Sequence, residues 1–146
     1  DLPPLQAAAP QRNAKQINEA IKGTVFSMKN FMHNKQNNLC VVYIPSPATI
    51  YANKTKIYFQ VYDPLNANER NYITPKANDQ KSRLIRKLLF NELKENNFDY
   101  FDLTPLLQEI GSKKYIHGEL DYRHFNYFGY KYVAHLLWNI KDSCIR

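Results

Sequence analysis

The sequence predicts an α/β fold in which a mainly parallel β-sheet lies between helices, as a three-layer α/β/α sandwich. Along the 146 residues, amphipathic helical patterns alternate with short apolar runs that are typical of buried strands. The run LCVVYI (residues 39–44) is apolar on both faces, as expected of a central strand covered by helices on each side. With 44% hydrophobic and 23% charged residues, the chain has the composition of one globular domain, residues 1–146.

The first half of the chain predicts one helix and one strand. Residues 1–11, rich in Pro and Ala, predict an irregular lead-in. Over residues 11–35, apolar side chains recur at three- and four-residue steps, which predicts an amphipathic helix: Ile17, Ile21, Val25, Met28 and Met32. Pro45 and Pro47 end the strand at residues 39–44. Two interpretations of residues 48–76 stay open: an edge strand at KIYFQVY, or an irregular excursion that shapes a pocket.

The second half continues the alternation. A helix is predicted over residues 77–97, capped by Asn78 or Asp79, and a strand over residues 98–103. A brief helical turn over residues 105–110 is predicted to stop at Gly111. The last helix is predicted to run from about residue 126 to residue 141. Strands separated by helices predict parallel pairing.

The net charge of +7 favours acidic partners in general, but it does not predict a nucleic-acid binder. The basic residues are dispersed, no recognised nucleic-acid motif is present, and Lys and Arg are expected on solvated helix faces. No run is long and apolar enough to predict a membrane span. Cys40 and Cys144 lack metal-ligand spacing, and the sequence leaves open whether they form a bridge.

The chemistry is concentrated in GELDYRHFNYFGY (residues 118–130). Asp121 lies three residues before His124, so the carboxylate can fix the tautomer of the imidazole and stabilise its protonated form, which makes His124 a candidate general base. Asn126 is a candidate N-cap of the last helix, and Gly129 would permit close packing. In the alternative interpretation, an Asp-x-x-His in a Tyr-rich loop is structural.

Three neighbouring residues are candidates for contacting a substrate: His117, Tyr122 and Asn126. They lie close to His124 in the sequence, and the aromatic residues of this stretch could stack on a sugar or an acyl chain. The alternative is that His117 is an exposed loop residue and that most of the aromatic side chains belong to the core and its rim.

The stretch DYRHFNYFG (residues 121–129) is similar to the last conserved block of the SGNH (GDSL-type) hydrolases, Asp-x-x-His-x-Asn-x-x-Gly. CVVYIPSP resembles the family's inner strand with its Pro-rich end, and YFDLTPLLQE resembles the segment that precedes the last block. The resemblance covers about the C-terminal two-thirds of the chain. It implies a flavodoxin-like α/β/α sandwich, ester hydrolysis on lipids or acylated glycans without metal or cofactor, and an extracytoplasmic or membrane-associated location. Asp121 and His124 would be the Asp and His of a Ser-His-Asp triad.

The chain departs from the family in its nucleophile. No Gly-Asp-Ser, oxyanion-hole Gly or Gly-x-Asn-Asp block occurs, and Asp1-Leu2 could be the tail of an Asn-Asp-Leu version of the last of these. The serine is therefore expected in a preceding segment, which makes this chain the C-terminal part of a longer SGNH-like domain. Ser46, flanked by prolines, is expected to be a turn residue. The alternative function is a non-catalytic domain of the same fold that binds a glycan or a protein partner.

Overall fold

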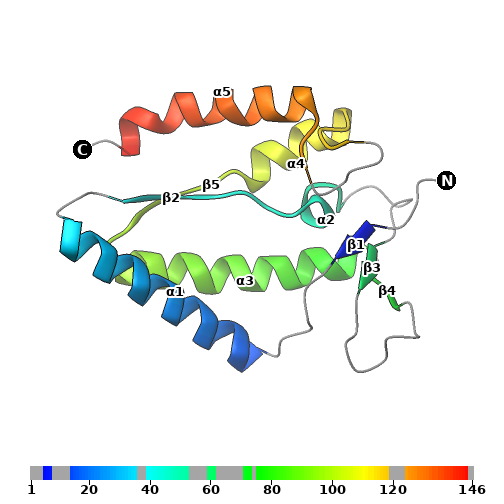
Figure 1. Ribbon diagram of the computed structural model, residues 1–146. Coiled ribbons are helices and arrows are strands. Elements are labelled where there is room, and N and C mark those ends of the chain that lie inside the picture. Colours follow the sequence, from blue (N-terminus) through cyan, green and yellow to red (C-terminus); the bar gives the residue numbers. More distant parts are fainter. Residues whose placement is uncertain are drawn as a thin grey trace.

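A computed structural model of the chain describes residues 5–7, 14–35, 39–52, 59–61, 71–73, 75–118 and 124–144. Its elements, in chain order, are β1 (Leu5–Ala7), α1 (Ala14–Lys35), β2 (Cys40–Tyr43), α2 (Pro47–Ile50), β3 (Phe59–Val61), β4 (Asn71–Ile73), α3 (Pro75–Glu95), β5 (Asp99–Asp102), α4 (Thr104–Lys113) and α5 (Tyr127–Cys144). The described part of the chain is mostly helical (Figure 1).

The central strands, β2 and β5, form a two-stranded parallel sheet. Cys40 lies opposite Asp99 and Tyr43 opposite Asp102, and the Leu103 N–H extends the pairing by donating to the Tyr43 carbonyl. A second, mixed sheet has the order β1-β3-β4, with β1 parallel and β4 antiparallel to β3. The fold is thus α/β with a parallel central pair, and its described sheet is smaller than the sequence predicts.

Helices cover both faces of the central pair, as the apolar run in β2 predicts (Figure 1). Val42 packs against the core of α2, α4 and α5, which includes Leu103, Leu107 and Leu136. Val41 packs against the core of α1 and α3, centred on Leu93. Successive side chains of a strand point to opposite faces, so one short strand joins two separate hydrophobic clusters.

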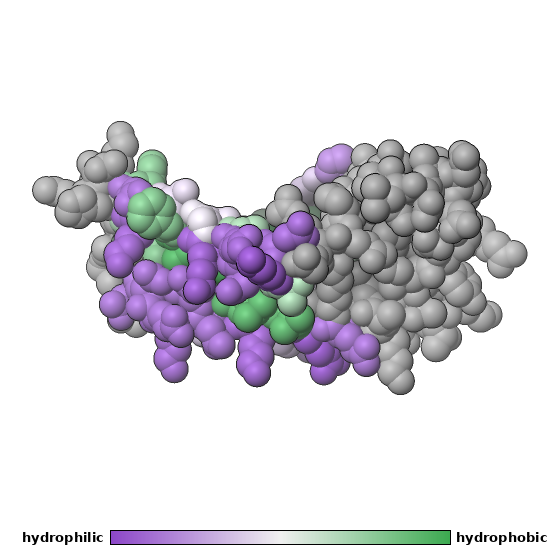
Figure 2. All heavy atoms as spheres, turned by 90° about the horizontal axis from the view of Figure 1, so that it is seen from below, coloured by the Kyte–Doolittle hydropathy of each residue, from purple (hydrophilic) through white to green (hydrophobic). Residues whose placement is uncertain are grey.

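The predicted face of α1 is confirmed. Ile17, Ile21 and Val25 are buried, and Met28 and Met32 pack against the cluster formed with α3. The side of the molecule that carries α1 and α3 is largely hydrophilic in its described part, with smaller apolar areas (Figure 2). This distribution agrees with charged side chains on solvated helix faces.

Several elements differ from the prediction. The predicted lead-in contains a strand, β1. The open stretch at KIYFQVY contains β3, in agreement with the strand interpretation, but β3 lies between β1 and β4 and is not an edge strand. The helix α3 begins at Pro75, because proline suits the first helical position, so Asn78 and Asp79 lie inside it and do not cap it. The short helix α2 after Ser46 was not predicted.

The predicted stop of α4 at Gly111 is wrong, because the helix continues to Lys113. A Cβ at position 111 would lie 2.6 Å from Ile50 Cγ2 and 3.3 Å from Tyr51 Cε1. Gly111 is therefore a packing residue that brings α4 against α2, rather than a helix terminator. Its role depends on a contact with a segment about 60 residues earlier, which local sequence does not indicate.

Cys40, in β2, is disulfide-bonded, and the only other cysteine of the sequence is Cys144. Among the helices of the described residues, none is both long and apolar enough to span a bilayer.

Candidate functional site

The loop that carries the candidate catalytic residues is described up to residue 118 and again from residue 124. Asp121 and Tyr122 lie outside the described residues, so their predicted roles stay predictions. His124 is described and is exposed, immediately before the segment that leads into α5.

The two ends of this loop form a short antiparallel pair, here called the loop stem (residues 116–118 and 124–126). His117 lies opposite Phe125 in a β-bridge. The Gly118 N–H donates to the His124 carbonyl at 3.3 Å, and the Asn126 N–H donates to the Ile116 carbonyl at 3.0 Å. The main chain of His124 is therefore held directly by the opposite side of the stem.

Asn126 joins the stem to α5 through its side chain. Its Oδ1 accepts the Gly129 N–H at 2.9 Å, so it is the N-cap of α5, as the sequence predicts. Its Nδ2 donates to the carbonyls of Tyr115 and His117, both at 3.1 Å. The side-chain amide of Asn126 thus caps α5 and also binds two carbonyls of the segment that forms the opposite side of the stem. The predicted contact of Asn126 with a substrate stays a prediction.

Gly129 allows the first turn of α5 to press against the stem. A Cβ at this position would lie 2.0 Å from the Ile116 carbonyl oxygen and 3.0 Å from Phe125 Cβ. Since the nearest atom belongs to the backbone of the stem, no side-chain rotation can relieve this contact. The predicted close packing of Gly129 is confirmed.

His117 is buried, with 5% of its surface exposed, which is contrary to its interpretation as an exposed loop residue. Its Nδ1 lies 2.8 Å from Tyr51 Oη, which also accepts the Ile116 N–H at 2.9 Å. Burial lowers the pKa of His117 to about 4, so the imidazole is neutral at neutral pH. Its ring packs against Phe125 with centroids 4.5 Å apart.

Tyr51 places the stem at the carboxyl end of β2. It follows directly after α2, which begins four residues after the last residue of β2. In open parallel α/β sheets, ligand-binding loops gather outside the carboxyl ends of the strands. Ser46 lies at the same end, exposed, as the N-cap residue of α2, with its hydroxyl 3.3 Å from that of Thr49.

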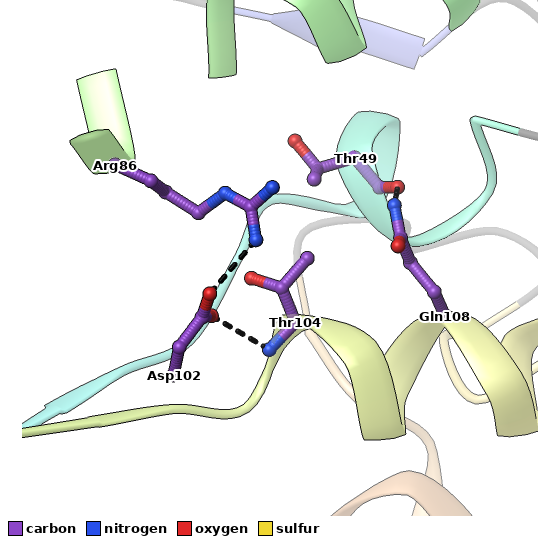
Figure 3. A network of polar contacts seen from close by, with 5 residues as sticks. All are labelled: Thr49, Arg86, Asp102, Thr104 and Gln108. Carbon is purple, nitrogen blue, oxygen red and sulfur yellow. Dashed lines mark hydrogen bonds and ion pairs between the residues drawn. The ribbon is translucent and has the colours of Figure 1, made fainter. Parts of the chain in front are cut away.

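A second polar cluster at this end of the sheet was not predicted from the sequence. This Arg86–Asp102 network comprises Thr49, Arg86, Asp102, Thr104 and Gln108 (Figure 3). Arg86 Nη1 donates to Asp102 Oδ2 at 2.8 Å, and the Thr104 N–H donates to Asp102 Oδ1 at 2.9 Å. The Gln108 amide donates to the Thr49 carbonyl at 2.8 Å. The local part of the network, Asp102 before Thr104, is a sequence signal for an Asx turn.

No protein-family model, curated protein or solved structure matches the chain. Within the residues that the structure describes, no group of three or more His, Cys, Asp or Glu side chains could hold a metal ion.

Exposed aromatic side chains lie next to the stem in the sequence. Tyr127 is 83% exposed, Tyr130 54% and Tyr115 44%. Tyr130 contacts Phe125 edge to face at 5.8 Å, and Lys114 Nζ lies 3.9 Å from the centroid of the Phe128 ring. Exposed aromatic rings suit an organic ligand with apolar faces, such as a sugar ring or an acyl chain.

Proposed function

We propose that this chain supplies the general base, His124, and its orienting carboxylate, Asp121, to a serine ester hydrolase of the SGNH type. The nucleophilic serine and the oxyanion-hole donors lie outside these residues. In this proposal β2 and β5 belong to a larger, mainly parallel sheet of a three-layer, flavodoxin-like sandwich. The substrate is an ester, with an acylated glycan or a lipid as the favoured classes.

The observation that carries the proposal is the position of His124. Its main chain is fixed in a hydrogen-bonded stem, its side chain is exposed, and the stem is tied to the segment that follows β2. A general base must be held within hydrogen-bonding reach of the proton that it removes, and a stem of this kind restricts its backbone.

The test is ester hydrolysis by the protein expressed from its complete reading frame, with p-nitrophenyl acetate as substrate. His124→Ala is expected to lower kcat by about 10²- to 10⁴-fold, because the nucleophile loses its base. His135→Ala is the matched control, since His135 is also exposed but lies on α5 and contacts Asn139. Absence of turnover in the parent protein, or equal turnover in both variants, would contradict the proposal.

The alternative is a non-catalytic domain that binds a glycan or a protein partner, and the exposed tyrosines next to the stem in the sequence favour a glycan. In that case the parent protein does not hydrolyse esters, and Tyr127→Ala weakens glycan binding while His124→Ala leaves it unchanged.

A further inference from the structure

One side chain ties the loop stem to the rest of the site. Tyr51 is 2% exposed, and its hydroxyl contacts both the Ile116 N–H and His117 Nδ1. We propose that Tyr51 is a positioning residue, which holds the loop stem, and through it His124, at the carboxyl end of β2. The proposal rests on the proposed function insofar as His124 is a catalytic base.

The direction of one hydrogen bond is fixed, and that of the other depends on the tautomer of His117. The Tyr51 oxygen accepts the Ile116 N–H. Burial raises the pKa of Tyr51, so the hydroxyl keeps its proton at neutral pH and can donate it to His117 Nδ1. In that direction His117 is the tautomer with its proton on Nε2.

The connection from Tyr51 to His124 runs through the backbone of the loop stem. Tyr51 holds the Ile116 amide, and the carbonyl of the same residue accepts the Asn126 N–H. On the same side of the stem, after His117, the Gly118 N–H donates to the carbonyl of His124. A shift of Ile116 is therefore transmitted across the stem to the backbone of His124.

The apolar part of Tyr51 has a separate role in the core. Its ring belongs to the cluster with Ile50 and Leu107 and packs beside Gly111. Replacement by Phe keeps this ring but leaves a buried N–H and a buried imidazole nitrogen without their present partner. Tyr51→Phe thus separates the effect of positioning from that of core packing.

In the protein expressed from its complete reading frame, Tyr51→Phe is expected to lower kcat by about 10- to 100-fold, because small displacements of a catalytic group are costly. KM should stay within about twofold, since Tyr51 is buried beneath the stem and does not bind substrate. Tyr100→Phe is the matched control, because Tyr100 stacks on Phe90 in the other hydrophobic cluster. Unchanged kcat in Tyr51→Phe, or an equal loss in Tyr100→Phe, would overturn the inference.

A second readout separates this inference from the proposed function. In NMR spectra of the protein expressed from its complete reading frame, Tyr51→Phe should shift the ring resonances of His124 and speed the amide exchange of Ile116 at least about tenfold. If the parent protein lacks hydrolase activity, the proposed function fails. The NMR measurements then test by themselves whether Tyr51 positions His124. Should Tyr51→Phe not fold, His117→Leu removes one of the two bonds and is read in the same way. Unchanged His124 resonances would refute the positioning of His124 by Tyr51.

Discussion

Two polar networks lie at the carboxyl ends of β2 and β5, and they are built on different principles. The loop stem is held by neutral groups: Tyr51, His117, Asn126 and main-chain amides. The Arg86–Asp102 network is built around an ion pair whose side chains are 17% and 23% exposed.

The two networks also differ in how completely their groups are satisfied. Asn126 uses its amide nitrogen and oxygen in three hydrogen bonds. In the other network, Arg86 Nε and Thr104 Oγ1 are buried and have no hydrogen-bond partner among the described residues. An ion pair taken out of water gains little net stability, whereas a satisfied neutral network fixes geometry at low cost. The stem is therefore expected to determine the position of His124, and the ion pair to be replaceable.

The largest expected effect on stability comes from adding a Cβ where α5 packs directly against the stem. Gly129→Ala places a Cβ against the Ile116 carbonyl, so the stem must move, and the free energy of unfolding should fall by about 4 kcal/mol or more. Urea unfolding measures this loss.

Gly23→Ala is the control, because nothing lies within 4 Å of a Cβ at this position in α1. It should raise the free energy of unfolding by about 0.5–1 kcal/mol through helix propensity alone. A loss of stability in Gly23→Ala, or none in Gly129→Ala, would contradict the described packing.

A smaller effect is expected at the ion pair. Arg86→Met leaves the half-buried Asp102 carboxylate without its cation, which should cost about 3 kcal/mol of unfolding free energy. The double variant Arg86→Met with Asp102→Asn keeps an oxygen for the Thr104 N–H and should lie within about 1 kcal/mol of the parent. If the double variant is no more stable than Arg86→Met, the charge itself is essential and the comparison with the stem fails.

Much of the fold could be predicted because its signals are local. The 3.6-residue periodicity of α1 and the apolar run of β2 depend only on neighbouring residues, and both predictions are confirmed. The end of α4 depends on a contact between Gly111 and Ile50, which no local pattern records. The sequence also indicates a larger sheet than the two parallel strands that the structure describes.

The candidate site shows the same division between features with a local sequence signal and features that depend on tertiary contacts. The capping of α5 by Asn126 was predicted, because the cap and its target are three residues apart. The bond between Tyr51 and His117 joins residues 66 positions apart, and that between Arg86 and Asp102 residues 16 positions apart. Such pairs are brought together only by tertiary packing, so the sequence leaves His117 as a substrate candidate or an exposed loop residue and does not single out Tyr51.

The smallest expected effect is a pH dependence of stability that originates in the stem. His117 has a pKa of about 4 in the folded chain, below its ordinary value of 6.5. Between these values the unfolded chain binds a proton that the folded chain does not, so stability falls as the pH falls through this window. The loss should be on the order of 2 kcal/mol and should be absent in His117→Gln. Unfolding by urea at several pH values compares the parent protein with His117→Gln. His135→Gln is the control, which should keep the pH dependence of the parent.

The most direct test of a neutral stem held by Tyr51 is the ¹⁵N NMR spectrum of the His117 ring, recorded from about pH 3 to pH 8. The account predicts that at neutral pH the proton is on Nε2, that Nδ1 is the acceptor from Tyr51, and that the ring titrates near pH 4. A proton on Nδ1 at neutral pH, or a titration midpoint near the ordinary value of 6.5, would contradict it.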